Sequence, residues 1–254
     1  MVERAVNRLL RSLGYGLNRI QPREPADLPS TSVELFRAVE PFTMTSPEAV
    51  HALADAIRYV IRSGVPGAIV ECGVWRGGSM QAAARTLLDL GAVDREIFLF
   101  DTFEGMPRPT DKDVRWTGEA AADLLASETG RAADLLRARA SLEDVRAVMG
   151  GVAYPTSRIH FVVGRVEETV PEQAPETIAV LRLDTDWYES SRHELQHLYP
   201  RLAPGGVLIL DDYAWWNGVA EATDKYFEEH PPMPFLIRID DSGARVAVKP
   251  DCGA

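Results

Sequence analysis

The chain has 254 residues, of which 46% are hydrophobic and 26% charged, a length and composition typical of one α/β domain with flanking segments and a sizeable core. It contains no apolar run of roughly 18 residues or more and no secretory signal pattern at its start, so no membrane-spanning helix and no export are expected. The net charge of −11 argues against a partner with a phosphate backbone, and we expect no binding to nucleic acid.

Residues 1–40 are predicted to form an N-terminal arm or lid of helices. Apolar residues at helical spacing from Val6 to Leu17 are interspersed with arginines, which predicts a basic amphipathic helix. Contact of this helix with a membrane surface is one interpretation. We favour a flap or a dimer element, with a homodimer or higher homo-oligomer as the expected assembly and no membrane partner.

From residue 41 onward, short apolar strands alternate with helical patterns. The predicted strands cover residues 67–73, 96–101, 158–163, 177–184 and 206–211. The predicted helices cover about 47–63, 78–90, 188–202 and 217–229, and a Pro-Gly-Gly sequence at 204–206 is expected to end the third. This alternation indicates a mostly parallel sheet with helices on both faces.

Two segments interrupt that pattern. Residues 102–157 have little strand character and are predicted to be a lid-like insertion, within which Ser141 begins a helix with a capping-box-like start. At the C-terminal end, strands at 235–240 and 244–249 flank a short polar turn, which predicts a hairpin and an antiparallel edge of the sheet.

A glycine-rich loop follows the first predicted strand. It runs from Glu71 to Ser79, and Gly73, Gly77 and Gly78 allow a tight turn with close approach of a ligand to the backbone. The spacing is not GxGxxG, which disfavours a dinucleotide fingerprint, and an ordinary tight turn remains an alternative. Asp101 ends the next strand, where an acid either binds a ribose diol or caps a helix.

A set of acids follows two later strands: Asp184 and Asp186 after one, Asp211 and Asp212 after the next. Neighbouring parallel strands end side by side, so these carboxylates are expected to meet. Clustered acids repel one another unless a cation or a proton neutralises them, and oxygen ligands suit Mg²⁺ or Ca²⁺. The alternative is that Asp211 and Asp212 cap a turn into Tyr213.

The motif HExxH at residues 193–197 is typical of zinc peptidases. No third histidine follows at the expected spacing, and the predicted helix only needs to cover the sheet. We therefore disfavour a zinc site. The two cysteines, Cys72 in a strand and Cys252 in the tail, form no disulfide framework, and they suit a reducing cytoplasm.

The stretches VECGVWRGGSM, LFDTFEGMP, LRLDTDWYESSRHELQHLYPRLAPGG and ILDDY resemble the macrocin O-methyltransferase family over residues 40–230. The resemblance implies a seven-stranded, Rossmann-like class I methyltransferase fold covering 41–254, S-adenosylmethionine as methyl donor, Mg²⁺ as cofactor, and a glycosylated acceptor from antibiotic biosynthesis whose deoxysugar hydroxyl is methylated. By position it implies metal ligands at Asp184, Asp211 and Asp212. It also implies donor contacts at Thr43, Met44, Glu71, Gly73, Ser79, Asp101, Gly164 and Val166.

The catalytic base is a separate question. More distantly similar catechol-type methyltransferases use a lysine three residues after the first metal aspartate, and Trp187 stands at that position here. Asp186 is therefore our first candidate for the base, with Asp184 second. Trp187, Tyr188 and Tyr213, together with two further tryptophans at 215 and 216, either wall the acceptor pocket or belong to the core.

Two rival functions remain open from the sequence. Asp184 and Asp186 in a DxD arrangement also fit a metal-dependent glycosyltransferase or phosphohydrolase. The fold could also serve as a non-catalytic binding domain. The glycine loop followed by Asp101 fits a methyl donor better than a nucleotide sugar.

Overall fold

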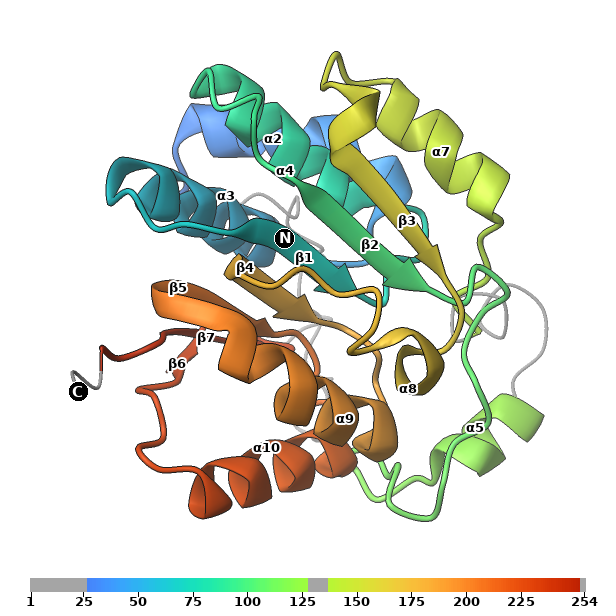
Figure 1. Ribbon diagram of the computed structural model, residues 1–254. Helices are drawn as coiled ribbons and strands as arrows, with labels where there is room; N and C mark the ends of the chain where they lie inside the picture. Colours follow the sequence, from blue (N-terminus) through green and yellow to red (C-terminus); the bar gives the residue numbers. More distant parts are fainter. Residues whose placement is uncertain (1–26, 128–136, 252–254) are drawn as a thin grey trace, which may run out of the picture.

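The computed structural model describes residues 27–127 and 137–251, and in these it forms one seven-stranded sheet between two layers of helices (Figure 1). The strands are β1 (Ala68–Cys72), β2 (Ile97–Asp101), β3 (Ile159–Val163), β4 (Ile178–Leu183), β5 (Leu202–Leu210), β6 (Ile237–Arg238) and β7 (Arg245–Val248). The amphipathic helix predicted within residues 1–26 and Cys252 lie outside the described residues.

The order of strands across the sheet is β3-β2-β1-β4-β5-β7-β6. Strands β1 to β5 pair in parallel, and β7 pairs antiparallel with both β5 and β6. The predicted parallel sheet with an antiparallel C-terminal hairpin is thus confirmed. The chain order reverses between β1 and β4, and ligands of open α/β sheets bind at such a switch point.

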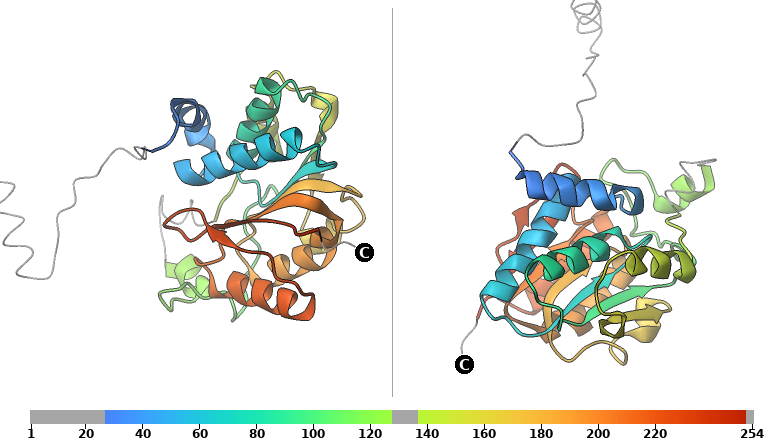
Figure 2. Two further views of the ribbon diagram at one scale, coloured as in Figure 1. Left: turned by 90° about the vertical axis from the view of Figure 1, so that its left-hand side faces the viewer. Right: turned by 90° about the horizontal axis from the view of Figure 1, so that it is seen from above.

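Helices cover both faces of the sheet (Figure 2). One layer holds α2 (Ser30–Val39), α3 (Pro47–Arg62), α4 (Gly78–Asp89) and α7 (Leu142–Gly150). The other holds α8 (Val166–Thr169), α9 (Tyr188–Leu198) and α10 (Asn217–Glu229). Because side chains alternate along a strand, Ile69 packs into the first layer and Val70 into the second, and both are fully buried.

The insertion after β2 contributes to two parts of the molecule. Its short helix α5 (Ala121–Ser127) places Ala121 in a small cluster with Trp187 and Trp216. Helix α7 packs Val145 and Met149 into the main core beside α4. Ser141 is its N-cap, as predicted: the hydroxyl accepts a 3.1 Å hydrogen bond from the Asp144 backbone N–H.

The predicted end of the helix at 188–202 is wrong. Helix α9 ends at Leu198, a 3₁₀ turn covers Tyr199–Arg201, and the Pro-Gly-Gly sequence lies inside β5. The pairing of β4 with β5 shifts there, from Ile178 opposite Leu202 to Val180 opposite Val207. Gly205, with φ of 76°, provides the backbone conformation that this irregularity needs, so the glycines mark a bulge and not a helix end.

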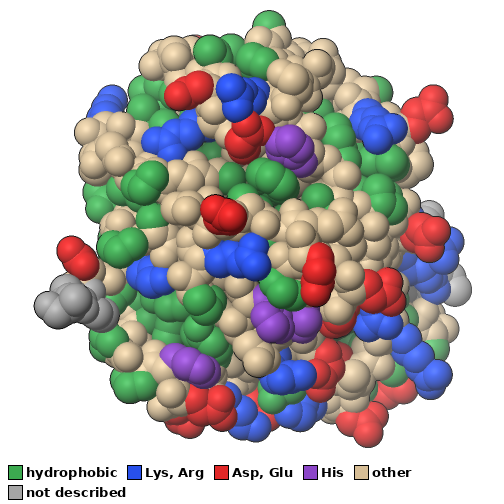
Figure 3. Space-filling model, viewed as in Figure 1, with side chains coloured by type: hydrophobic (Ala, Val, Ile, Leu, Met, Phe, Trp, Pro, Cys, Tyr) green, Lys and Arg blue, Asp and Glu red, His purple; other side chains and the backbone are tan. Residues whose placement is uncertain are grey.

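None of the helices in the described ranges is long and apolar enough to span a bilayer. On the face drawn in Figure 3, acidic and basic side chains lie intermixed.

Gly73 joins the ends of β1, β2 and β4. Its N–H donates to the Phe100 carbonyl (2.9 Å), and a Cβ at this position would lie 1.9 Å from the Asp184 carbonyl oxygen. Its φ is 81°.

We expect Gly73→Ala to lower the free energy of unfolding by at least about 3 kcal/mol, because it combines left-handed strain with a backbone clash. Gly91→Ala is the matched control, since Gly91 has a similar φ of 68° but open space around it. The control should cost about 1 kcal/mol. Urea unfolding of both variants measures the difference, and equal losses would refute the clash.

Candidate active site

A pocket opens where β1 to β4 end, at the edge of the sheet toward which their arrowheads point in Figure 1. Backbone and side chains from the N-terminal segment, the glycine loop, the insertion and the loop after β4 line it. The lining residues are Met44, Gly73, Trp75, Phe100, Asp101, Thr102, Gly105, Met106, Pro107, Ala138, Gly164, Arg165, Val166, Glu167, Asp184, Thr185, Asp186 and Ser190.

The predicted site residues divide into two groups. Those that line the pocket are Met44, Gly73, Asp101, Gly164, Val166, Asp184 and Asp186. Those that do not line it are Thr43, Glu71, Ser79, Asp211 and Asp212, among which Glu71, Ser79 and Asp212 are buried. The predicted residues therefore lie in one region, some of them in the pocket wall and the others outside it.

The glycine loop forms the turn from β1 into α4. Gly77 is the N-cap of α4 in a left-handed conformation, and Gly78 lies so close to the Phe42 carbonyl that a Cβ would be 2.6 Å from its oxygen. The missing side chains thus let the segment before α3 cross the loop directly. Trp75 also has a positive φ, 47°, which is rare for a bulky residue and indicates local strain.

Asp101 lies at the end of β2 and organises the loops around it. One carboxylate oxygen accepts hydrogen bonds from the N–H groups of Val74 (2.7 Å) and Trp75 (3.1 Å), and the other accepts from Phe103 N–H (2.7 Å). Carboxylate oxygens have further lone pairs, so a ligand hydroxyl can still be accepted on the pocket side.

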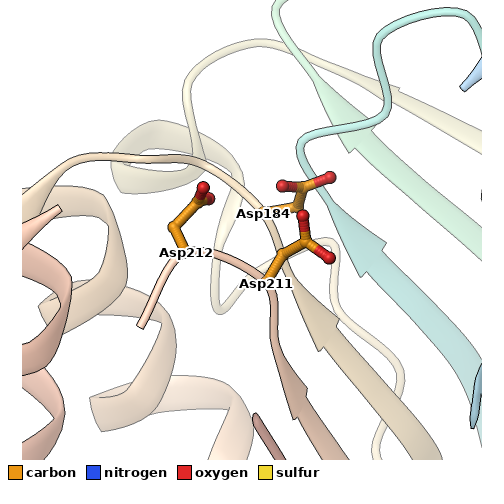
Figure 4. A group of neighbouring side chains, drawn as sticks. All are labelled: Asp184, Asp211 and Asp212. Carbon is orange, nitrogen blue, oxygen red and sulfur yellow. The ribbon is translucent and has the colours of Figure 1, made fainter. Parts of the chain in front are cut away.

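The acids after β4 and β5 come together as predicted (Figure 4). Asp184, Asp211 and Asp212 each offer one carboxylate oxygen, and these oxygens lie within 4.8 Å of one another. In the parts of the chain that the structure describes, this is the one group of three or more acids, histidines or cysteines placed closely enough to share a metal ion.

Arg182, which the sequence analysis missed, lies in the middle of this cluster. Its side chain is 2% exposed. Nη1 donates to Glu71 (2.8 Å) and to Asp184 (2.5 Å). Nη2 donates to Asp211 (2.6 Å) and to the Thr45 hydroxyl (2.8 Å). The available signal was a charged residue inside the apolar strand, two positions before Asp184 and hence on the same face of the sheet.

Burial dominates the protonation behaviour of the cluster. It raises the pKa of Glu71 to about 7, although Arg182 opposes the shift. It also raises the pKa values of Asp184 and Asp212 well above their usual range, and repulsion between the aspartates adds to the effect. A neighbouring positive charge would therefore stabilise the ionised forms of these carboxyls and lower their pKa values.

Asp186 differs from the other acids in its backbone and its partners. Its φ is 65°, and its carboxylate accepts a 2.7 Å hydrogen bond from the Trp216 indole N–H. Burial raises its pKa to about 6, partly opposed by that hydrogen bond. A carboxyl with such a pKa in a pocket wall is suited to proton transfer near neutral pH.

The three aromatic residues predicted to contact substrate have packing roles. Trp187 is 3% exposed, meets the Trp216 ring edge-on and donates to the Pro107 carbonyl. Tyr188 is buried at the start of α9, and Tyr213 bonds through its hydroxyl to Asp224 (2.7 Å). None of the three lines the pocket described above, and their contact with an acceptor stays a prediction.

The HExxH motif lies on α9, and none of its residues belongs to the group that could share a metal ion. Glu194 is fully buried beneath the loop after β4, where its carboxyl accepts a 3.0 Å hydrogen bond from the Thr185 hydroxyl. The ring of His193 contacts the Val170 carbonyl (2.9 Å). The motif is thus explained by packing of α9 against the sheet.

The mostly parallel sheet in this order, the glycine loop after its first strand and the acid after its second, together with the match to a solved O-methyltransferase, place the chain among class I methyltransferases that use S-adenosylmethionine. The profile of the Macrocin-O-methyltransferase (TylF) family matches residues 34–246, and the chain belongs to this family. It is an O-methyltransferase, as the sequence motifs predicted.

Named relatives carry similar activities. The chain is 32% identical over 201 residues to mycinamicin III 3''-O-methyltransferase of Micromonospora griseorubida, covering 79% of this chain and 76% of the relative. It is 35% identical over 207 residues to 8-demethyl-8-(2,3-dimethoxy-alpha-L-rhamnosyl)-tetracenomycin-C 4'-O-methyltransferase of Streptomyces olivaceus, covering 79% and 73%.

Solved structures agree with this assignment. The O-methyltransferase NovP is 29% identical, with a TM-score of 0.72 and coverage of 82% of both chains. The calicheamicin methyltransferase CalS11 is 21% identical, with a TM-score of 0.59 and coverage of 92% of this chain and 99% of that one, and it supports the fold alone.

Proposed function

We propose that this enzyme methylates a sugar hydroxyl of a glycosylated small molecule, a deoxysugar of an antibiotic-type natural product, and that it requires Mg²⁺. The observation that carries the proposal is the cluster of Asp184, Asp211 and Asp212, of which Asp184 lines the pocket described above, here called the donor pocket. One named relative acts on a rhamnosyl tetracenomycin, which is a glycosylated compound. We place the enzyme in the cytoplasm, where the buried Cys72 thiol stays reduced.

The acid cluster fits a divalent cation. Arg182 bonds one oxygen of Asp184 and one of Asp211, which leaves the second oxygen of each for another partner. Oδ2 of Asp212 is buried without a hydrogen-bond partner. Three carboxylates with uncommitted oxygens provide the hard ligands that Mg²⁺ prefers. When bound there, the cation would supply Lewis acidity that lowers the pKa of an acceptor hydroxyl.

Methyl transfer then requires one proton acceptor and a fixed geometry. The acceptor oxygen attacks the methyl carbon as the carbon–sulfur bond breaks, and the bonding electron pair stays on sulfur, giving S-adenosylhomocysteine. Asp186 takes the hydroxyl proton, and its hydrogen bond to Trp216 fixes the carboxyl in the pocket wall. Asp101 and the glycine loop orient the donor, which supplies acceleration through positioning.

The acceptor class is tested with three kinds of compound: a deoxysugar glycoside, its aglycone and a catechol. We expect methylation of the glycoside only, because the aglycone lacks the sugar hydroxyls and because Trp187 stands where catechol-type methyltransferases carry a lysine base. Mass spectrometry of the product should locate the added methyl group on the sugar fragment. Methylation of the aglycone or of the catechol in place of the glycoside would contradict the proposed acceptor.

The metal requirement is tested by chelation and by substitution. We expect EDTA treatment to abolish turnover and Mg²⁺ to restore it, and Asp211→Asn to lower kcat by about 100-fold or more. Asp241→Asn, which changes an exposed aspartate of the hairpin turn, is the matched control and should leave kcat unchanged. Full activity of the Asp211 variant in EDTA would disprove the role of the cation.

The role of Asp186 is tested by Asp186→Asn. The amide cannot take the acceptor proton, so kcat should fall on the order of 10²- to 10⁴-fold. Binding of S-adenosylhomocysteine, measured by calorimetry, should persist, since the donor pocket stays intact. If the variant turns over at the wild-type rate, the base is another group, with Asp184 the next candidate.

A further inference from the structure

Arg182 connects the acid cluster to the segment at residues 41–45, here called the donor-side segment. We infer that Arg182 is a positioning residue that couples cation binding to donor binding through the Thr45 hydroxyl. The inference rests on the proposed cation site, and it adds an energetic link between two ligands that the site would otherwise bind independently.

The link is a single rigid group. Nη2 of Arg182 bonds both the Asp211 carboxylate (2.6 Å) and the Thr45 hydroxyl (2.8 Å), while Nη1 bonds Asp184 and Glu71. A guanidinium is planar, and its N–H groups have a fixed geometry. If the guanidinium rotates when the carboxylates move, the N–H group that bonds Thr45 therefore moves as well. Arg182 is 2% exposed, so water does not replace these partners readily.

The donor-side segment borders the donor pocket through one residue. Met44 lines that pocket, and the Thr43 hydroxyl accepts a 3.1 Å hydrogen bond from the Thr45 N–H. The far end of the segment is held by Arg76 of the glycine loop, whose Nη1 donates to the Pro41 carbonyl (2.9 Å). The Arg182–Thr45 bond is therefore one attachment of the inner end of this segment, next to Ser46, which caps α3 and donates to Asp240.

These contacts predict the sign of the coupling between cation binding and donor binding. Asp184, Asp211 and Asp212 would hold the cation, and a bound cation would restrain the two carboxylates to which Arg182 donates, those of Asp184 and Asp211. The guanidinium then holds Thr45, and with it Met44 against the donor. Cation binding should thus tighten donor binding, and by linkage donor binding should tighten cation binding by the same factor.

Thr45→Val is the variant that tests this, because it removes the hydroxyl while keeping the shape of the side chain. Substitution of Arg182 itself is less informative, since it would leave Glu71 buried without its partner. Thr45→Ser retains the hydroxyl and is the matched control. The measurement is the affinity for S-adenosylhomocysteine by calorimetry, with and without Mg²⁺, for each protein.

In the wild type and in Thr45→Ser, Mg²⁺ should tighten S-adenosylhomocysteine binding by at least about 5-fold. In Thr45→Val the ratio of the affinities for S-adenosylhomocysteine with and without Mg²⁺ should fall to near one. Binding of Mn²⁺ in the absence of S-adenosylhomocysteine, followed by electron paramagnetic resonance, should stay as in the wild type. A purely structural role for Thr45 would weaken donor binding equally with and without Mg²⁺ and leave the ratio unchanged, which would overturn the inference.

The measurements distinguish a wrong cation site from a wrong coupling between the two ligands. If Mn²⁺ does not bind the wild type, the proposed cation site is wrong and the inference is wrong with it. If Mn²⁺ binds but the ratio is near one in the wild type, or if Thr45→Ser loses the ratio as Thr45→Val does, the cation site stands and the coupling alone is refuted.

Discussion

The arrangement of the acid cluster depends on the buried guanidinium of Arg182. Carboxylates in a low-dielectric environment repel one another strongly, and Glu71, Asp184 and Asp211 lie together because Arg182 donates to all three. A buried ion pair of this kind contributes little net stability, and removing one partner leaves an uncompensated charge. Its value here is geometric, since it decides which carboxylate oxygens remain free and in which direction they face.

The fold was largely predictable, because its signals are local. Apolar strands with glycines or acids at their ends gave the parallel sheet, and the short turn before Ala244 gave the hairpin. The end of α9 was mispredicted because Gly205 and Gly206 have the same appearance in a bulged strand as after a helix. Tertiary pairing of β5 with β4 decides between the two, and no local pattern contains that information.

The site was predictable in its acids and less so in their partners. Asp184, Asp211 and Asp212 follow strand ends, so topology alone brings them together. The roles of Trp187 and Arg182 depend on which layer each side chain enters and on contacts far away in the sequence. A tryptophan beside an acid cluster can wall a pocket or pack behind it, and its contacts with Trp216 and with Pro107 of the insertion come from parts of the chain far away in the sequence.

The positive φ angles of Trp75, Phe103 and Asp186 have a consequence for engineering. Left-handed conformations cost about 1–2 kcal/mol for non-glycine residues, and here they occur around the strand ends that form the pocket. Relieving that strain in the loops after β1, β2 and β4 would raise thermal resistance where the side chain is not itself needed for packing, which excludes Phe103 of the main core. Laboratory selection for heat tolerance alone would tend to relax these loops and erode turnover, so such selection should include an activity screen.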